Sequence, residues 1–235
     1  MKNTKIQNTP FTQTMKMAEL IDTNYKLLLL LPRFDIDLGF GELTVRKLCE
    51  ENNICPELFL VICNVYTFDD YIPDEKYIEL LNVQQFIDYL KKSHLYYMND
   101  RLKNISDQLQ IIVQDSEQPH GAILSRFFEQ YKVELLNHFA YEDEVVFPYV
   151  LGIADGKKSA DYQIRIFEEN HTNIDDKLND LKNILTKYLH GNSSLEKRIQ
   201  LIFNLFDFEE DMRKHTLLED RVLISKVRKM ESHYE

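Results

Sequence analysis

The chain has 235 residues, 44% of them hydrophobic, enough to build one large domain or two small ones around packed cores. Glycine and proline are scarce, with six residues each, which favours long helices over a protein of sheets and turns. The formal net charge of −11 disfavours binding to nucleic acid or to anionic membranes, because like charges repel.

Residues 1–72 are predicted to form a small helical N-terminal domain. Its expected helices cover residues 15–31, 44–51 and 56–65; the first should stop at Pro32, and Pro56 suits the first position of the third. The first ten residues, MKNTKIQNTP, contain no apolar signal core, and no apolar run is long enough to span a membrane. Cys49, Cys55 and Cys63 form no CxxC pair. A soluble protein of the reducing cytoplasm is therefore expected.

The second part of the chain, residues 77–231, is predicted to be an antiparallel four-helix bundle. An acidic stretch with Pro73, TFDDYIPDEK (67–76), separates it from the first part. Four long segments follow, at about residues 82–113, 121–150, 159–189 and 195–231, joined by the short loops 115–121, 152–158 and 190–194. Short loops between long helices make consecutive helices antiparallel, so the fold class is an all-α, up-down bundle behind a small helical domain.

Apolar residues in the four segments recur in alternating steps of three and four, as expected for core-facing stripes. Histidines and glutamates occur inside these stripes. The second segment, for example, runs Leu124, Phe128, Tyr131, Leu135, His138, Glu142, Val145 and Tyr149, and the third ends with Leu178, Leu181, Leu185 and Tyr188. Polar residues at core positions point to a functional layer, since a buried charge is costly unless it is well paired.

The polar residues in the stripes have the types and spacing of a metal site. His138 and Glu142 are four residues apart, as are His215 and Glu219, so each pair presents an imidazole and a carboxylate on one helical face. A shift of 77 residues superimposes the first of two sets on the second: His94, His138 and Glu142 on His171, His215 and Glu219.

The repeat predicts two related helical hairpins that place four histidines and two glutamates around one centre. Imidazole and carboxylate ligands suit iron, and a carboxylate can bridge two metals. We therefore expect two non-haem iron ions with bridging carboxylates and open positions for small diatomic ligands such as O2 or NO. His120, His190 and His233 fall in predicted loops or the tail and are not expected to be ligands.

These motifs resemble the hemerythrin/HHE family, and most of all its iron–sulfur cluster repair branch, the repair of iron centres (Ric) proteins. The stretch HFAYEDEVVFPYV (138–150) resembles the signature H-x3-E-E-x2-[LV]-F-P of that branch, with Asp143 in place of the second acid. The stretches SHLYYM, EENHTNI and DFEEDMRKHTLLEDRVL resemble the other ligand helices. The resemblance covers about residues 80–230 and implies a hemerythrin-like di-iron bundle.

Two departures from the family qualify the resemblance. Respiratory hemerythrins carry HxxxH on the third helix, whereas Asp175 stands four residues after His171, which favours the repair branch. The sequence LGFG stands where the N-terminal domain of the branch has adjacent cysteines, which argues against a thiol-based role there. The helical spacing also places three residues near the predicted ligands. Glu134 lies one turn before His138, and Tyr97 and Tyr131 are expected to be hydrogen-bonding or packing partners.

Three functions stay open at this point. By resemblance, the protein would act in the nitrosative and oxidative stress response, reducing or capturing NO or supplying iron to damaged iron–sulfur clusters, with iron–sulfur proteins as partners. A second reading is an O2 or NO sensor or carrier without catalysis, and a third is a structural bundle with zinc or no metal. The sequence does not choose between enzyme and sensor, and an oligomer is compatible with each reading.

Overall fold

A computed structural model describes residues 9–116, 120–157, 162–170, 175–189 and 194–233. It confirms the all-α class: the described residues form helices, and their one β-type pairing is an isolated bridge between Lys16 and Thr44. Among the helices in these ranges, none combines the length and the apolar character needed to cross a lipid bilayer.

The N-terminal helices are shorter than predicted in one place. The structure has α1 (Met17–Thr23), α2 (Val45–Glu51), α3 (Pro56–Thr67) and α4 (Glu75–Leu80). The helix expected over residues 15–31 was wrong in its length, because Asn24 leaves the helix with φ −144° and ψ 98°. The Asn24 side chain then accepts a hydrogen bond from the Lys26 N–H and starts the 3-10 turn η1 (Tyr25–Leu29).

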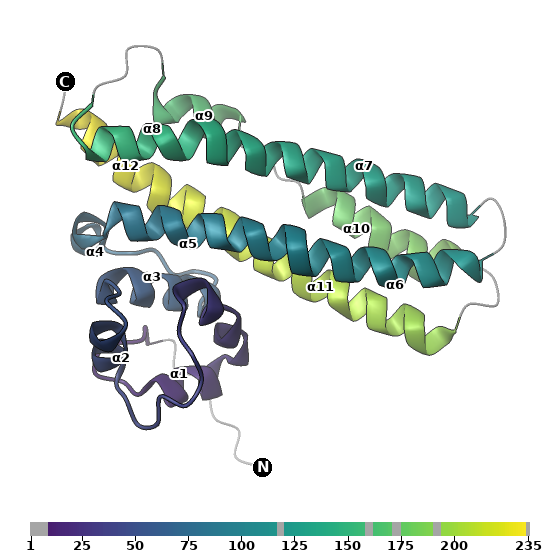
Figure 1. Cartoon of the computed structure of the whole chain (residues 1–235), viewed down its shortest axis with the longest axis horizontal. Coiled ribbons are helices and arrows are strands. Elements are labelled where there is room, and N and C mark those ends of the chain that lie inside the picture. The colour runs from purple at the N-terminus through teal and green to yellow at the C-terminus, as the bar shows by residue number, and fades with distance from the viewer. Residues whose placement is uncertain (1–8, 117–119, 158–161, 171–174, 190–193, 234–235) are drawn as a thin grey trace. The chain divides into compact units, whose positions relative to one another are not determined.

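The C-terminal helices match the four predicted segments closely (Figure 1). Several are interrupted by π-helical turns, which carry the label η like the 3-10 turn above. The order is α5 (Val83–Tyr96), η3 (Tyr97–Arg101), α6 (Leu102–Gln114), α7 (His120–Tyr141), η4 (Glu142–Val146), α8 (Phe147–Ala154), α9 (Ile164–Asn170), α10 (Asp175–Asn183), η5 (Ile184–Tyr188), α11 (Leu195–Leu218), η6 (Glu219–Leu223) and α12 (Ile224–Ser232).

The chain divides into two compact units. One comprises Ser93–Tyr149 and Asp161–Thr216, and the other comprises Met1–Lys92, Val150–Ala160 and Leu217–Glu235. The second unit therefore combines the N-terminal helices with the last helix, and Lys226 of α12 donates a hydrogen bond to the Glu79 carbonyl of α4. The predicted separation between residues 72 and 77 stays a prediction.

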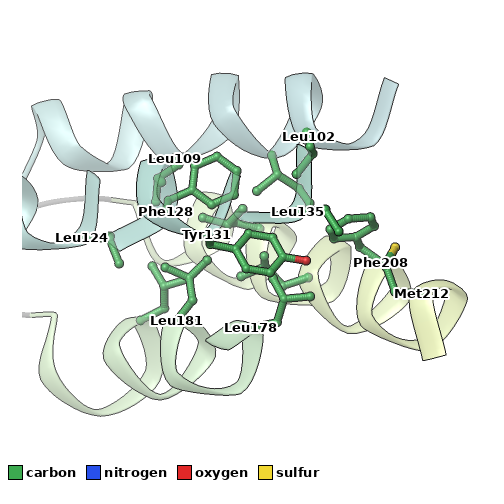
Figure 2. Packing of buried hydrophobic residues seen from close by; sticks show 14 of the residues in the cluster. Leu102, Leu109, Leu124, Phe128, Tyr131, Leu135, Leu178, Leu181, Phe208 and Met212 are labelled. Atoms are coloured by element: carbon green, nitrogen blue, oxygen red, sulfur yellow. The ribbon is translucent and has the colours of Figure 1, made fainter. Parts of the chain in front are cut away.

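The apolar core of the bundle lies between α6, α7, α10 and α11, and Figure 2 shows its side chains pointing toward one another. All four helices contribute leucine, isoleucine or aromatic side chains to it. Phe128, for example, is 1% exposed, and Leu124, Leu135 and Leu178 are fully buried. Burying side chains of this size contributes about 1.5–3 kcal/mol each, so this cluster is a main source of stability.

The π turns change which residues face this core. A π turn adds one residue to a helical turn, so the apolar stripe moves by one position where it occurs. Within η4, Val146 is fully buried, whereas the predicted Val145 is 39% exposed. At the end of η5, Leu189 is buried, whereas the predicted Tyr188 is 62% exposed. These two core predictions were wrong because the stripes were counted as unbroken α-helix.

Candidate metal centre

Two of the predicted ligands, Glu142 and Glu219, lie where a helix changes from α to π geometry. The turn η3 begins three residues after His94, η4 begins at Glu142, and η6 begins at Glu219. Single π turns inside α-helices are rare overall, and those that occur are often found at functional sites. Residues four apart lie on one helical face, so the two residues of each HxxxE pair face the same side. The π turn then changes the face on which the following residues lie.

Four of the six predicted ligands form one buried group: His94, Glu142, His215 and Glu219. One ligand atom from each lies within 4.8 Å of all the others. The Nε2 atoms of His94 and His215 are 3.1 Å apart, and His94 Nε2 is 3.2 Å from Glu142 Oε2. No member of the group is more than 1% exposed. The structure thus brings together two imidazoles and two carboxylates, a set suited to a divalent or trivalent metal ion.

His138 reaches the same group through Glu142. Its Nε2 is 3.0 Å from Glu142 Oε1, and its side chain is 15% exposed, which leaves it the most accessible of these histidines. The other predicted ligand, His171, lies outside the described residues. Glu142 therefore presents one oxygen to His138 and the other oxygen to His94.

The donor set fits iron. Imidazole nitrogen with carboxylate oxygen is the mixture used by non-haem iron sites, whereas zinc in structural sites favours thiolates, and the three cysteines all lie in the N-terminal helices or their loops. Two carboxylates in a dry environment also favour a cation, since uncompensated buried charge is costly. The residues present are thus compatible with the metal that the sequence pattern predicts.

Aromatic rings enclose the group. The His94 ring stacks on Phe139 with centroids 4.2 Å apart and on Phe147 at 5.6 Å. The Tyr97 ring meets the His215 ring edge-on at 5.6 Å. Such walls fix the planes of the imidazoles and keep water away, which strengthens electrostatic interactions inside the site.

The three residues predicted to surround the ligands have three different environments. Tyr97 is fully buried beside His215, but its hydroxyl donates to Asp211 Oδ1 at 3.1 Å. Tyr131 packs in the apolar cluster of Figure 2, where its ring stacks on Phe128. Glu134 lies on the surface, half exposed, and forms an ion pair with Lys177. The structure does not bring Glu134 to the buried group, since its helical position faces outward.

Sequence reasoning assigned no role to two acids that the structure places beside the ligands. Asp143 Oδ1 is 3.1 Å from His94 Nδ1. Asp211, which is 4% exposed, accepts from Tyr97. A signal existed for Asp211, because it precedes His215 by four residues and so lies on the same helical face. The signal for Asp143 was the signature H-x3-E-E, in which it stands at the second acid, whereas helical periodicity did not place it beside His94.

A helical bundle with a buried layer of histidines and glutamates is a metal-binding bundle by both fold and site. The chain belongs to the hemerythrin HHE cation-binding domain family, whose model matches residues 86–227. It is also similar to two proteins named iron–sulfur cluster repair protein ScdA. The protein of Staphylococcus haemolyticus is 24% identical over 154 residues, which cover 63% of this chain and 69% of the relative. That of Staphylococcus epidermidis is 23% identical over 155 residues, covering 63% and 68%.

Proposed function

We propose that this chain holds two iron ions at the buried histidine and glutamate group and acts in the nitrosative and oxidative stress response as an iron–sulfur cluster repair protein. In this role it reduces or captures NO, or donates iron to damaged clusters. The observation that carries the proposal is the convergence of His94, Glu142, His215 and Glu219, with ligand atoms within 4.8 Å.

The contacts of Glu142 support two ions rather than one. Its two oxygens approach two different histidines, at 3.2 Å from His94 Nε2 and 3.0 Å from His138 Nε2. Glu142 could therefore hold one ion with each of its oxygens, beside His94 on one side and His138 on the other. By the internal repeat of the sequence, Glu219 would play the corresponding part in the second set of residues.

The residues around the group support chemistry on a small ligand. When bound, a pair of irons supplies one-electron redox steps and open coordination positions for NO or O2. The chain binds and orients the ions with its imidazoles and carboxylates, and the rings of Phe139, Phe147 and Tyr97 exclude water. His138, at 15% exposure, marks the side of the group nearest to solvent.

The repair role is supported by the two similar staphylococcal proteins, both of which are named iron–sulfur cluster repair protein. The partners proposed are O2, NO and iron–sulfur proteins. The three free cysteines suit a reducing compartment, so we place the protein in the cytoplasm. Burial raises the pKa of the Cys49 thiol to about 12 and the pKa of Cys63 well above its usual value, so neither favours the thiolate needed for redox chemistry.

A specific contact favours the second function, an O2 or NO sensor without catalysis. Arg221, two residues after Glu219, donates hydrogen bonds to the carbonyl oxygens of Asp69 and Tyr71, at 2.8 and 2.9 Å. A change at Glu219 upon ligand binding would thus have a short path to the segment that follows α3.

One experiment separates these functions. Protein purified without oxygen is analysed for iron and recorded optically before and after addition of NO and then of O2. Two irons per chain, with a nitrosyl band that decays as N2O forms, support repair-type NO chemistry. Two irons with only a reversible O2 adduct support the sensor. Protein that neither contains nor takes up iron contradicts both.

A further inference from the structure

His94 has a contact that none of its roles as a ligand requires. Its Nε2 faces the buried group, whereas its Nδ1, on the other edge of the ring, lies 3.1 Å from Asp143 Oδ1. The imidazole is fully buried, and the Asp143 side chain is 32% exposed. A carboxylate at the edge of the site thus contacts the one ring nitrogen that does not face the other ligands.

The chemistry of this pair determines the tautomer of the histidine. An ionised carboxylate only accepts hydrogen bonds, so Nδ1 carries the proton and donates to Asp143. The lone pair is then on Nε2, which points to Glu142 and His215, so that this nitrogen can coordinate a metal. The opposite tautomer would place a proton on the nitrogen that has to bind.

The aromatic walls alone do not select this orientation. Phe139 and Phe147 stack on the His94 ring and fix its plane. A half rotation about the Cβ–Cγ bond keeps that plane but turns carbon atoms toward the metal group. A hydrogen-bond acceptor at Nδ1 disfavours this rotation, because the rotated ring would present a carbon atom to it, and Asp143 is the acceptor at that position.

The π turn η4 makes the contact possible. Glu142 and Asp143 are consecutive residues, yet both reach His94: Glu142 Oε2 lies 3.2 Å from Nε2 and Asp143 Oδ1 lies 3.1 Å from Nδ1. Both belong to the first turn of η4. The widened turn thus places one carboxylate on the metal edge of the ring and the next on its outer edge.

We infer that Asp143 is a positioning residue for the iron ligand His94, holding its Nδ1–H tautomer and its orientation, while its negative charge favours the oxidised state of the iron that His94 binds. This inference rests on the proposed function, because it assigns Asp143 a role only toward bound iron. Partners of this kind typically change metal affinity by about 10- to 100-fold when they are removed.

The test compares the full chain with the variants Asp143→Ala, Asp143→Asn and Glu144→Ala. Each is titrated anaerobically with ferrous iron, and the midpoint potential of the loaded protein is measured. Asp143→Ala removes the acceptor and should weaken one of the two iron sites by about 10- to 100-fold. Asp143→Asn keeps an acceptor oxygen but no charge, so affinity should stay within a few-fold while the potential becomes more positive. Glu144 is an exposed acid of the same turn and serves as the control, with both quantities unchanged.

The outcomes separate this inference from the proposed function. If the wild-type chain takes up no iron, the proposed function and this inference fall together. If it takes up iron but Asp143→Ala binds equally well at the same potential, the proposed function stands and the role of Asp143 is overturned. An unchanged potential in Asp143→Asn would refute the contribution of its charge. Circular dichroism of each variant shows whether the fold is retained.

Discussion

The two halves of the helical bundle use the same core stripes for different purposes. In the half shown in Figure 2, the stripes carry leucine and phenylalanine, such as Leu124 and Phe128, which fill space and need no partner. In the other half, the same stripes carry His94, Glu142 and His215, which are equally buried but polar. In this second half, π turns begin at Glu142 (η4) and Glu219 (η6) and three residues after His94 (η3).

This difference between the two halves indicates which half stabilises the fold and which half carries the function. Apolar burial stabilises the fold without any ligand. Buried carboxylates and imidazoles contribute little net stability by themselves, since their desolvation cost offsets their attraction. The apolar half should therefore hold the bundle together in the apo state, and the polar half should gain stability when it binds metal.

The largest expected effect is in the apolar half. Phe128→Ala removes a ring that is 1% exposed and should lower the free energy of unfolding by about 3–5 kcal/mol. Urea denaturation measures this change. Phe203→Ala is the matched control, because Phe203 on α11 is 66% exposed and its loss should change stability by less than about 0.5 kcal/mol. Iron content per folded chain should be the same in both variants, and a large loss of iron in Phe128→Ala would show that the halves are not separable.

Iron removal addresses the polar half. A ligand that binds only the native state stabilises it by about 2.7 kcal/mol when its free concentration is 100 times its dissociation constant. Chelation should therefore lower the unfolding temperature of the wild-type chain, while far-UV circular dichroism keeps its helical signal. Equal unfolding temperatures with and without iron would contradict the idea that the polar layer depends on metal for its stability.

Glu142→Gln should remove most of the stability that the chain gains from binding iron. The substitution keeps the shape of the side chain but removes the charge that faces His94 and His138, so iron affinity should fall at least about tenfold, equivalent to 1.4 kcal/mol. Glu134→Gln, on the same helix, is the control: it breaks only a surface ion pair with Lys177, worth at most about 1 kcal/mol, and should leave iron binding intact. Weakened iron binding in Glu134→Gln would show that Glu134 acts beside the ligands, as the sequence predicted.

Much of this comparison could be predicted from the sequence. Heptad-like spacing predicted the four long helices, and the 77-residue repeat singled out the ligand residues, four of which form the buried group. Spacing could not predict the π turns, because a count of apolar positions assumes a constant helical period. The errors at Val145 and Tyr188 have this single cause: a π turn changes the phase of the helix by one residue.

The smallest expected effect comes from the boundary between the two halves, at Tyr97. Its hydroxyl donates to Asp211 Oδ1, and its ring packs on Phe208 and against His215. Tyr97→Phe keeps the ring and removes one hydrogen bond, so unfolding should become easier by about 0.5–1.5 kcal/mol with no change in iron stoichiometry. Tyr188→Phe, at an exposed position, should have no effect. Loss of iron in Tyr97→Phe would show that Tyr97 and Asp211 contribute to metal binding. Their hydrogen bond would then hold His215 in place rather than only stabilise the core.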